Sequence, residues 1–177
     1  ENTVIGPNEL EYGVYSALVK LGQRKKVLAL PPDFTRFHSR AGDITTLIYK
    51  YYRESLSDIL PALGTHSPMT AAEIAEMFKG VPAELFRIHD WRNDVVTVGT
   101  VPGDFISDIT EGKLSYSWPA QLNKLLVNGK HDLIISIGQV VPHEVVGMAN
   151  YNKNLFVGTG GPEGINKSHF VGAVYGM

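Results

Sequence analysis

Short apolar runs alternate with helical periodicity along the first third of the chain. Residues 25–30 (KKVLAL) are typical of a buried strand, which two prolines end. Apolar positions at three- and four-residue spacing predict a helix over residues 43–57, with Asp43 as its N-cap. A short strand over residues 58–63 and a turn at Gly64 are expected next.

A second helix is predicted to begin at a capping box. Thr70 and Glu73 have the spacing at which each side chain can satisfy the other's backbone N–H. The helix extends to about the residue before Gly80, which is suited to end it. Two strands are predicted to follow, over residues 85–89 (LFRIH) and 95–101 (VVTVGTV).

The second half of the chain continues this alternation. Residues 102–117 are rich in Gly, Asp and Ser and are predicted to be loop, and residues 119–127 to be a helix whose proline occupies the first turn. Residues 132–137 (DLIISI) give the strongest strand signal, and a last strand is predicted over residues 155–157. A glycine-rich turn and a short helix near residues 162–169 complete the pattern.

Alternating strands and helices predict an α/β fold, with a mostly parallel, Rossmann-like sheet flanked by helices. The 177 residues, of which 44% are hydrophobic and 19% charged, suit one domain with a real core. The chain begins without Met and stops inside a segment, FVGAVYGM, that has the character of ordered structure. We therefore expect it to be one domain, residues 1–177, of a longer protein.

Composition excludes several classes of protein. The net charge of −2 shows no basic excess of the kind that nucleic-acid binding requires. Cysteine is absent, which excludes disulfides, iron–sulfur clusters and thiolate zinc sites within the chain. No apolar stretch approaches the ~20 residues of a membrane span, and no signal peptide is visible. We expect a cytoplasmic protein with no nucleic-acid or membrane partner.

Three of the predicted strands lead into polar segments. These are PPDFTR at residues 31–36, GTHSPMT at residues 64–70 and GQVVPHE at residues 138–144. In a parallel sheet the carboxyl ends of the strands share one edge, where ligands bind in open α/β folds. Topology would then gather four side chains near one crevice: Asp33, Arg36, His66 and His143.

Each of these side chains also has a structural interpretation. Asp33 could be an Asx-turn residue, and Arg36 a surface cation rather than a bidentate partner for a carboxylate. His66 could cap the helix that begins shortly after it, and a lone histidine such as His143 is more often structural than catalytic. The remaining histidines of interest have only a structural interpretation: His38, His89 and His131.

The glycine-rich run GTGGPEG, residues 158–164, allows two interpretations. Its backbone N–H groups could hold a phosphate ahead of the following helix. The run does not match the dinucleotide-binding fingerprint, because the sixth position is Glu163, and it lacks the lysine of a P-loop. A tight turn is the favoured interpretation.

Four motifs, taken in order, resemble the N-terminal domain of the nickel-dependent lactate racemase family. They are PPDFTR, THSPMTAAEI, VVPHEVVGMANYNKNLFVGTGG and a following histidine, His169. His143, Lys153 and His169 stand at intervals of 10 and 16 residues, and the resemblance extends from about residue 25 to the end of the chain.

The resemblance implies an isomerase of two domains that carries a nickel-pincer nucleotide. By position, Lys153 matches the lysine that tethers this cofactor, His169 matches the histidine that completes nickel coordination, and Thr35 lies in a motif that contacts the cofactor. The C-terminal domain that closes the site in the family is not in this sequence. We therefore expect the chain alone to be nearly inactive, and an expressed fragment to lack the cofactor.

The resemblance also implies the reaction, which is racemisation or epimerisation of a 2-hydroxy acid by hydride transfer to the cofactor. His66 and His143 match the paired acid/base histidines, and Arg36 matches the arginine that holds the substrate carboxylate. Asp33 belongs to the same D-x-T-R motif as a further catalytic residue. An imidazole suits this role, because both of its protonation states exist near neutral pH. The substrate could be lactate, another short hydroxy acid or a sugar acid.

One segment departs from the family pattern. Many members have Gly-Gly-Arg immediately before the lysine, where this chain has Asn150-Tyr151-Asn152. This difference leaves open a non-catalytic module that binds a nucleotide or a hydroxy acid. A further alternative is a zinc enzyme that uses three histidines as ligands: His66, His143 and His169.

Overall fold

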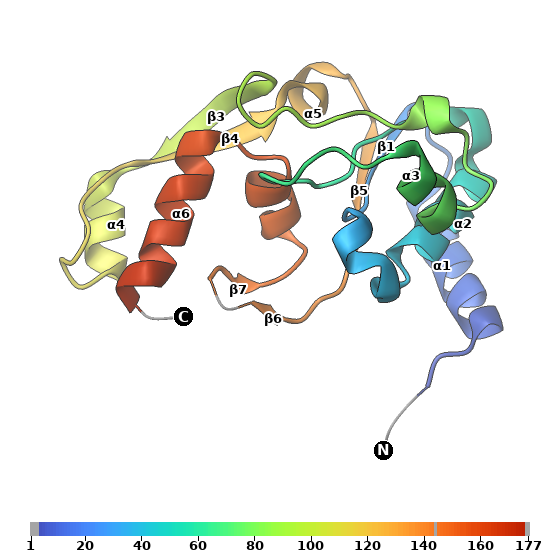
Figure 1. Cartoon of the computed structure of the whole chain (residues 1–177), viewed down its shortest axis with the longest axis horizontal. Helices are drawn as coiled ribbons and strands as arrows, with labels where there is room; N and C mark the ends of the chain where they lie inside the picture. Colours follow the sequence, from blue (N-terminus) through green and yellow to red (C-terminus); the bar gives the residue numbers. More distant parts are fainter. Residues whose placement is uncertain (1–3, 144, 176–177) are drawn as a thin grey trace.

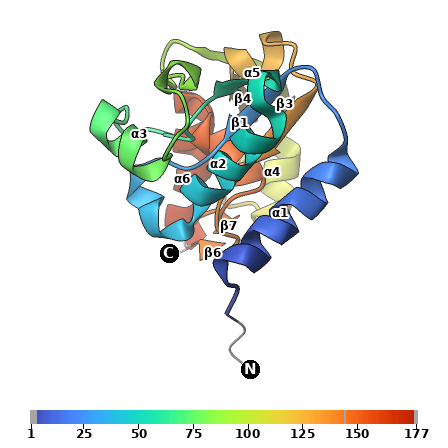
Figure 2. The same ribbon diagram turned by 90° about the vertical axis from the view of Figure 1, so that its right-hand side faces the viewer.

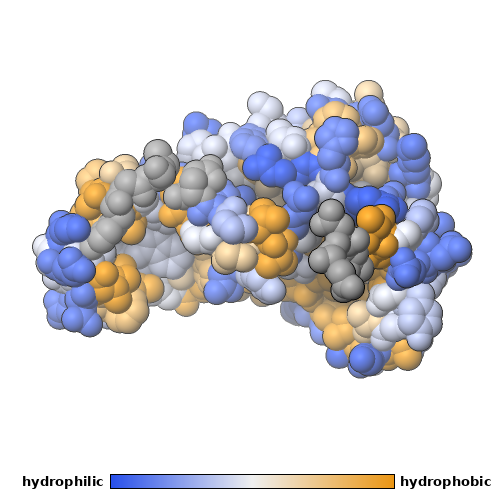
Figure 3. All heavy atoms as spheres, turned by 90° about the horizontal axis from the view of Figure 1, so that it is seen from below, coloured by the Kyte–Doolittle hydropathy of each residue, from blue (hydrophilic) through white to orange (hydrophobic). Residues whose placement is uncertain are grey.

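The computed structural model describes residues 4–143 and 145–175. The chain has a broad body and a narrower extension, which Figures 1 and 3 show. In chain order the elements are α1 (Pro7–Leu21), β1 (Val27–Leu30), η1 (Phe34–Ser39), α2 (Ala41–Tyr52), η2 (Arg53–Ser55), β2 (Leu56–Ile59), α3 (Ala71–Met77), η3 (Ala83–Leu85), β3 (Val95–Val101), α4 (Gly103–Ile109), β4 (Trp118–Asn123), α5 (Lys124–Asn128), β5 (Leu133–Ser136), β6 (Pro142–His143), β7 (Gly147–Met148), η4 (Asn154–Gly158) and α6 (Pro162–Tyr175).

A three-stranded parallel sheet of order β2-β1-β5 forms the centre of the body. Every residue of β1 is buried, because both faces of the sheet are covered. Val27 and Ala29 face the core under α1 and α2, which lie together on one side of the sheet in Figure 2. Leu28 and Leu30 face the opposite way and pack against α5 and η4. The predicted α/β fold with a parallel sheet is therefore confirmed.

The extension is built on an antiparallel pair of strands. β3 pairs with β4 from Val95 opposite Asn123 to Val101 opposite Trp118. α6 packs along β4, and α4 lies at the far end of the pair in Figure 1. The prediction of a helix over residues 119–127 is wrong for its first half, because backbone pairing with β3 makes that part a strand.

Three further predictions of local structure are wrong. Residues 102–117 contain α4 and are not all loop; Ile106, which is buried, anchors this helix. Residues 85–89 form only an isolated bridge, between Phe86 and Ile59, rather than a strand. Residues 155–157 lie in the π-helical turn η4 and not in a strand. They pair with no strand in the described part of the chain, and Leu155 packs against the buried residues of β1.

Other boundaries are refined by the structure. The helix predicted over residues 43–57 spans Ala41–Tyr52. Its N-cap position is Arg40, which makes no side-chain capping bond, and not Asp43, which accepts a hydrogen bond from the Arg40 Nε at 2.7 Å. The strand predicted over residues 58–63 is observed as β2, which begins two residues earlier. The hydrophobic pattern did not predict helix α1. The capping box of Thr70 and Glu73 is confirmed.

Some sequence-based predictions fall outside the described residues. They are Glu144 in the polar segment after β5, and the last two residues of the terminal segment. None of the helices in the described part of the chain is long and apolar enough to cross a membrane.

Candidate active site

The carboxyl ends of the three parallel strands lie at one edge of the sheet, as the sequence predicted. β1 leads to Asp33, β2 leads to the turn with His66, and β5 leads to Gly138. In Figure 1 this is the lower edge, where η1, η4 and the β6–β7 hairpin lie. Seen from below in Figure 3, the surface shows small apolar groups among polar side chains rather than one continuous apolar face.

Asp33 and His66 are in direct contact at this edge. His66 Nδ1 lies 2.5 Å from Asp33 Oδ2. Because an ionised carboxylate only accepts hydrogen bonds, the imidazole donates through Nδ1, and in the neutral ring the lone pair then lies on Nε2. The Asp33 side chain is buried, whereas about half of the His66 side chain is exposed. The pair therefore presents an oriented base to solvent.

The structure assigns local roles to these two residues. Asp33 is an Asx-turn residue, because its Oδ1 accepts from the Thr35 backbone N–H at 3.0 Å and from the Thr35 hydroxyl. Its second oxygen contacts His66, and its catalytic role stays a prediction. His66 does not cap α3, since Thr70 is the N-cap.

Arg36 lies in η1 at a kink in the helix, with φ −109° and ψ 27°. Its Nη1 donates to the Thr35 Oγ1 at 3.2 Å, and the side chain is exposed. Arg36 also lines a small cavity of about 60 Å³ together with Lys153. Two cationic side chains from distant parts of the chain thus meet at one cavity.

The segment that carries Lys153 is held by two asparagines. Asn150 Oδ1 accepts from the Ser136 hydroxyl at 2.6 Å and from Asn154 Nδ2 at 2.9 Å, and Asn150 Nδ2 donates to the Gly138 carbonyl at 3.1 Å. Asn154 is buried and also donates to the Ile137 carbonyl. These bonds attach the lysine segment to the end of β5. Sequence reasoning noted Asn150 only as part of a departure from the family pattern and missed its structural role and Asn154, because their polar partners are distant in sequence.

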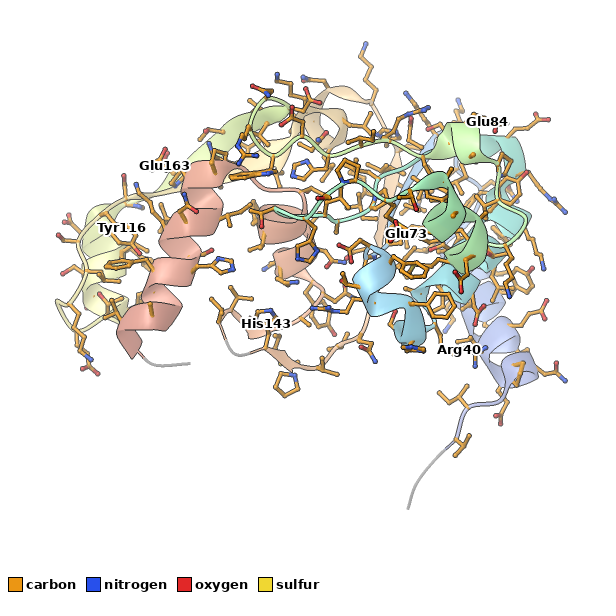
Figure 4. The ribbon with its side chains drawn as sticks, in the orientation of Figure 1. Arg40, Glu73, Glu84, Tyr116, His143 and Glu163 are labelled. Carbon is orange, nitrogen blue, oxygen red and sulfur yellow. The ribbon has the colours of Figure 1, made fainter. Side chains whose placement is uncertain are left out.

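His143 lies in the β6–β7 hairpin, below η4 and between α6 and η1 in Figure 4. Its Nδ1 accepts from the backbone N–H of Val145 at 3.1 Å and of Val146 at 3.4 Å. A neutral ring whose Nδ1 accepts carries its proton on Nε2. In the neutral state His143 therefore has the tautomer opposite to that of His66, and its Nε2–H can donate a hydrogen bond.

His169 lies on α6 and is exposed. Its Nδ1 is 2.8 Å from the Ile165 carbonyl oxygen, which only accepts. Nδ1 therefore donates, and in the neutral ring Nε2 carries the lone pair that a metal ion could bind.

The glycine-rich segment between η4 and α6 is a packed junction. An added Cβ at Gly158 would lie 2.6 Å from Ala62 Cβ, and one at Gly161 would lie 2.6 Å from Gln121 Oε1. The Gly164 N–H already donates to Gln121 Oε1 at 3.0 Å. The tight-turn interpretation of this run is therefore favoured over a phosphate cradle.

His89, which had only a structural interpretation, holds this junction from inside. It is 3% exposed, its Nε2 donates to the Gly160 carbonyl at 3.0 Å, and its Nδ1 accepts from Asn123 Nδ2 at 2.9 Å. Burial lowers the pKa of His89, although the Gly160 carbonyl and the charges of Asp90 and Asp94 act in the opposite direction. The ring is thereby kept neutral.

The structure brings some predicted site residues together and leaves others apart. Asp33 with His66, and Arg36 with Lys153, form two pairs that η1 connects. The lining of the cavity does not include His66, His143 or His169. In the described part of the chain no group of three or more His, Asp or Glu side chains is placed to hold a metal, so the three-histidine zinc site is wrong.

Comparisons with known proteins address the fold and the family of the chain. The chain aligns with a crystal structure of a protein from Thermotoga maritima at 26% identity and a TM-score of 0.77, covering 98% of this chain and 44% of that one. It aligns with the lactate racemase apoprotein from Thermoanaerobacterium thermosaccharolyticum at 25% identity and a TM-score of 0.65, covering 88% and 38%. The chain thus spans less than half the length of either structure. No curated protein sequence matches it.

The family model for the lactate racemase N-terminal domain matches residues 14–175, nearly the whole chain. This match includes the strand ends, the Asp33–His66 pair, the lysine segment and α6. The chain therefore belongs to the lactate racemase N-terminal domain family.

Proposed function

We propose that this chain supplies the acid/base half of a racemase or epimerase that acts on 2-hydroxy acids. The observation that carries the proposal is that hydrogen bonds orient both histidines. His66 Nδ1 is held by the Asp33 carboxylate, and His143 Nδ1 accepts from two backbone N–H groups. Racemisation needs a base on one face of the reacting carbon and an acid on the other, and membership of the lactate racemase domain family supports this role.

Each side chain has a distinct task in this mechanism. The Arg36 guanidinium binds the substrate carboxylate, which fixes the acid while leaving C2 free to present either face. His66 Nε2 takes the proton of the 2-hydroxyl group as hydrogen leaves C2, and a planar 2-keto acid results. His143, protonated from solvent, returns a proton to the carbonyl oxygen when hydrogen is added to the opposite face. Proton exchange with solvent then restores both rings.

We propose that hydrogen leaves C2 as a hydride, because the C–H bond at this carbon is very weakly acidic and its removal as a proton is difficult. The nickel-pincer nucleotide, when bound, supplies the hydride acceptor. The side chains of this domain suit that cofactor: Lys153 borders the cavity beside Arg36, and His169 holds an unprotonated Nε2 outward from α6. Lys153 would tether the cofactor and His169 would bind its nickel.

The reaction is tested with full-length protein loaded with the cofactor. Single enantiomers of short 2-hydroxy acids are incubated in deuterated water, and configuration and label at C2 are followed. We expect inversion with the original hydrogen retained at C2, and loss of inversion in both His66→Ala and His143→Ala. Retained configuration across the whole panel, or full activity in either variant, contradicts the proposal.

The cofactor assignment has a separate readout. Intact-protein mass spectrometry of protein produced together with the cofactor-synthesis enzymes should show an adduct that Lys153→Ala lacks. His169→Ala should keep the adduct but lose nickel, measured by elemental analysis. Lys124→Ala, a lysine whose Nζ donates to the Asn93 carbonyl in another cavity, is the control and should keep both. Binding of hydroxy acids without adduct or nickel would instead indicate a non-catalytic binding module.

A further inference from the structure

A cavity beside α5 lies away from the candidate active site. Its volume is about 420 Å³, within the roughly 300–1,000 Å³ of sites that bind small organic ligands. In Figure 1 α5 lies at the upper side of the molecule, whereas the candidate active site lies at the lower edge. The described residues that line this cavity include none of those assigned to the proposed reaction. A ligand bound beside α5 would therefore occupy a second, separate site.

Part of the lining of this cavity is apolar. Three aliphatic side chains contribute to it: Leu60, Leu125 and Ile88. Leu60 is fully buried, Leu125 packs against the same core cluster, and Ile88 is 65% exposed. An exposed isoleucine beside buried leucines offers a hydrophobic contact to the apolar part of a ligand, because binding there removes apolar surface from water.

Arg87 is held at the cavity by a buried carboxylate. Its Nε donates to Asp58 Oδ1 at 2.7 Å, and its Nη1 donates to the Glu84 carbonyl at 2.7 Å. Asp58 is 6% exposed, and its Oδ2 accepts from His131 Nε2 at 2.9 Å and from the Ser57 hydroxyl at 2.8 Å. Burial acts to raise the pKa of Asp58, but the hydrogen bonds from these partners outweigh it and lower the pKa, so the carboxylate is ionised. The guanidinium is thereby oriented before any ligand binds.

The oriented guanidinium keeps donors for a ligand. A guanidinium has five N–H groups, and three of those of Arg87 are not used by Asp58 or Glu84. Planar N–H pairs of this kind bind a carboxylate group. Lys124 also lines the cavity, and its Nζ donates to an uncharged group, the Asn93 carbonyl, at 2.7 Å. The positive charge of Lys124 therefore adds to the attraction for a carboxylate.

The charges at the cavity are balanced, which favours a ligand that carries both signs. Asp58 compensates Arg87, so the remaining charges of the lining are those of Lys124 and Asp94. Asp94 is exposed, and its backbone carbonyl accepts from the Lys124 N–H at 2.8 Å, which places the two residues side by side. A simple anion would be repelled by Asp94, and a simple cation by Lys124. A zwitterion can pair with both.

We propose that this cavity binds a free α-amino acid with an apolar side chain. Arg87 and Lys124 bind its carboxylate, and Asp94 binds its ammonium group. The apolar side chain of the ligand lies against the three aliphatic side chains of the lining. The inference does not depend on the proposed racemase reaction, because the two sites share no residue.

Calorimetry on full-length protein tests this assignment with three probes of similar size. L-Phenylalanine carries both charges, 3-phenylpropionate lacks the ammonium group, and 2-phenylethylamine lacks the carboxylate. We expect L-phenylalanine to bind at least about 10-fold more tightly than either analogue, because only the zwitterion pairs with both charges of the cavity. An analogue that binds within twofold of L-phenylalanine, or no binding of L-phenylalanine at about 10 mM, overturns the inference.

Two variants locate the bound amino acid. Arg87→Met and Asp94→Asn should each weaken L-phenylalanine binding by about 10-fold or more. Asp94→Asn leaves the Arg87–Asp58 pair intact, so it decides the matter even if circular dichroism shows that Arg87→Met is unfolded. Wild-type affinity in Asp94→Asn contradicts the assignment.

Two further variants are the controls. Arg53→Met removes an exposed arginine from a different cavity, of about 510 Å³, and should bind L-phenylalanine as wild type does. Arg36→Ala, at the candidate active site, should also keep wild-type affinity. Loss of binding in Arg36→Ala together with normal binding in Arg87→Met would place the amino acid in the candidate active site and overturn the inference.

Discussion

At the scale of single residues, Asp33 connects local structure to chemistry. One carboxylate oxygen begins η1 by accepting from Thr35, and the other orients His66. The residue is 5% exposed, so its hydrogen bonds form away from bulk water, where they are stronger. One buried side chain thus fixes both the position of Arg36 in the following turn and the tautomer of the base.

Replacement Asp33→Asn tests this orienting role. The amide fills the same space but removes the charge that stabilises the protonated His66 ring. Loss of a residue that orients a metal-binding side chain typically costs about 10- to 100-fold in activity, and by analogy we expect kcat to fall by a similar factor. KM for lactate should change little, because Arg36 remains in place. Steady-state kinetics of the loaded, full-length protein measures both constants.

Asp43→Asn is the matched control for this measurement. Asp43 pairs with Arg40 in the first turn of α2, and both side chains are substantially exposed. The control should retain wild-type kinetics. A kcat for Asp33→Asn within twofold of wild type would show that His66 does not depend on this carboxylate.

At the scale of elements, the junction between η4 and α6 decides where two functional side chains lie. Lys153 precedes η4, and His169 lies in α6. His89 binds the Gly160 carbonyl between these elements and also Asn123, whose Oδ1 accepts from the Leu125 N–H at the start of α5. If the Asn123 amide rotated to turn Oδ1 toward His89, it would lose the hydrogen bond from Leu125 N–H that caps α5. A proton on His89 Nδ1 therefore has no acceptor there.

This arrangement predicts how stability depends on pH. The folded-state pKa of His89 is lowered, mainly by burial, so the unfolded chain binds its proton more readily. The neutral, buried His89 contributes fully to the free energy of unfolding above about pH 6.5, the pKa of an exposed histidine. This contribution is lost as pH falls from there toward the lower folded-state pKa. The free energy of unfolding should fall by at most about 1.4 kcal/mol per pH unit in this window.

Urea unfolding of the chain between pH 7 and pH 5 measures the slope. His89→Gln removes the titrating group and should flatten the slope, at some cost in stability at pH 7. His38→Gln, a substitution of an exposed histidine in η1, leaves His89 in place and should keep the wild-type slope. An unchanged slope in His89→Gln would rule out His89 as its source.

At the scale of the whole molecule, close contacts at glycine join the parts that carry the site. The Gly64 N–H donates to the Gly158 carbonyl at 2.8 Å, which joins the turn beside His66 to η4. An added Cβ at Gly158 would lie 2.6 Å from Ala62 Cβ. The absence of a side chain at position 158 lets these two segments lie against each other.

Gly158→Ala should therefore destabilise the fold. Overpacking of this kind costs about 1–3 kcal/mol, which urea unfolding measures as a lower midpoint. Gly13→Ala is the contrasting control, because nothing lies within 4 Å of its added Cβ in the middle of α1. That substitution should stabilise the chain by about 0.5–1 kcal/mol. Equal stability of Gly158→Ala and wild type would contradict the packing argument.

The sequence by itself determined those features that depend on neighbouring residues or on simple topology. The uninterrupted apolar run of β1 and the Thr70 capping box depend on local patterns, and both are observed. The parallel order of strands was enough to place Asp33 and His66 at one edge. The motifs and their spacing were enough to identify the family, which the domain match shows.

Only the tertiary structure decided the features that depend on partners distant in sequence. β4 is a strand because β3 supplies its hydrogen bonds, although its own residues also suit a helix. The hydrogen bonds that orient His66 and His143 come from partners that no spacing rule could identify. The orientation of Asn150 likewise depends on Gly138 and Ser136 at the end of β5. Such contacts form only after the chain has folded, because their geometry is set by packing rather than by local preference.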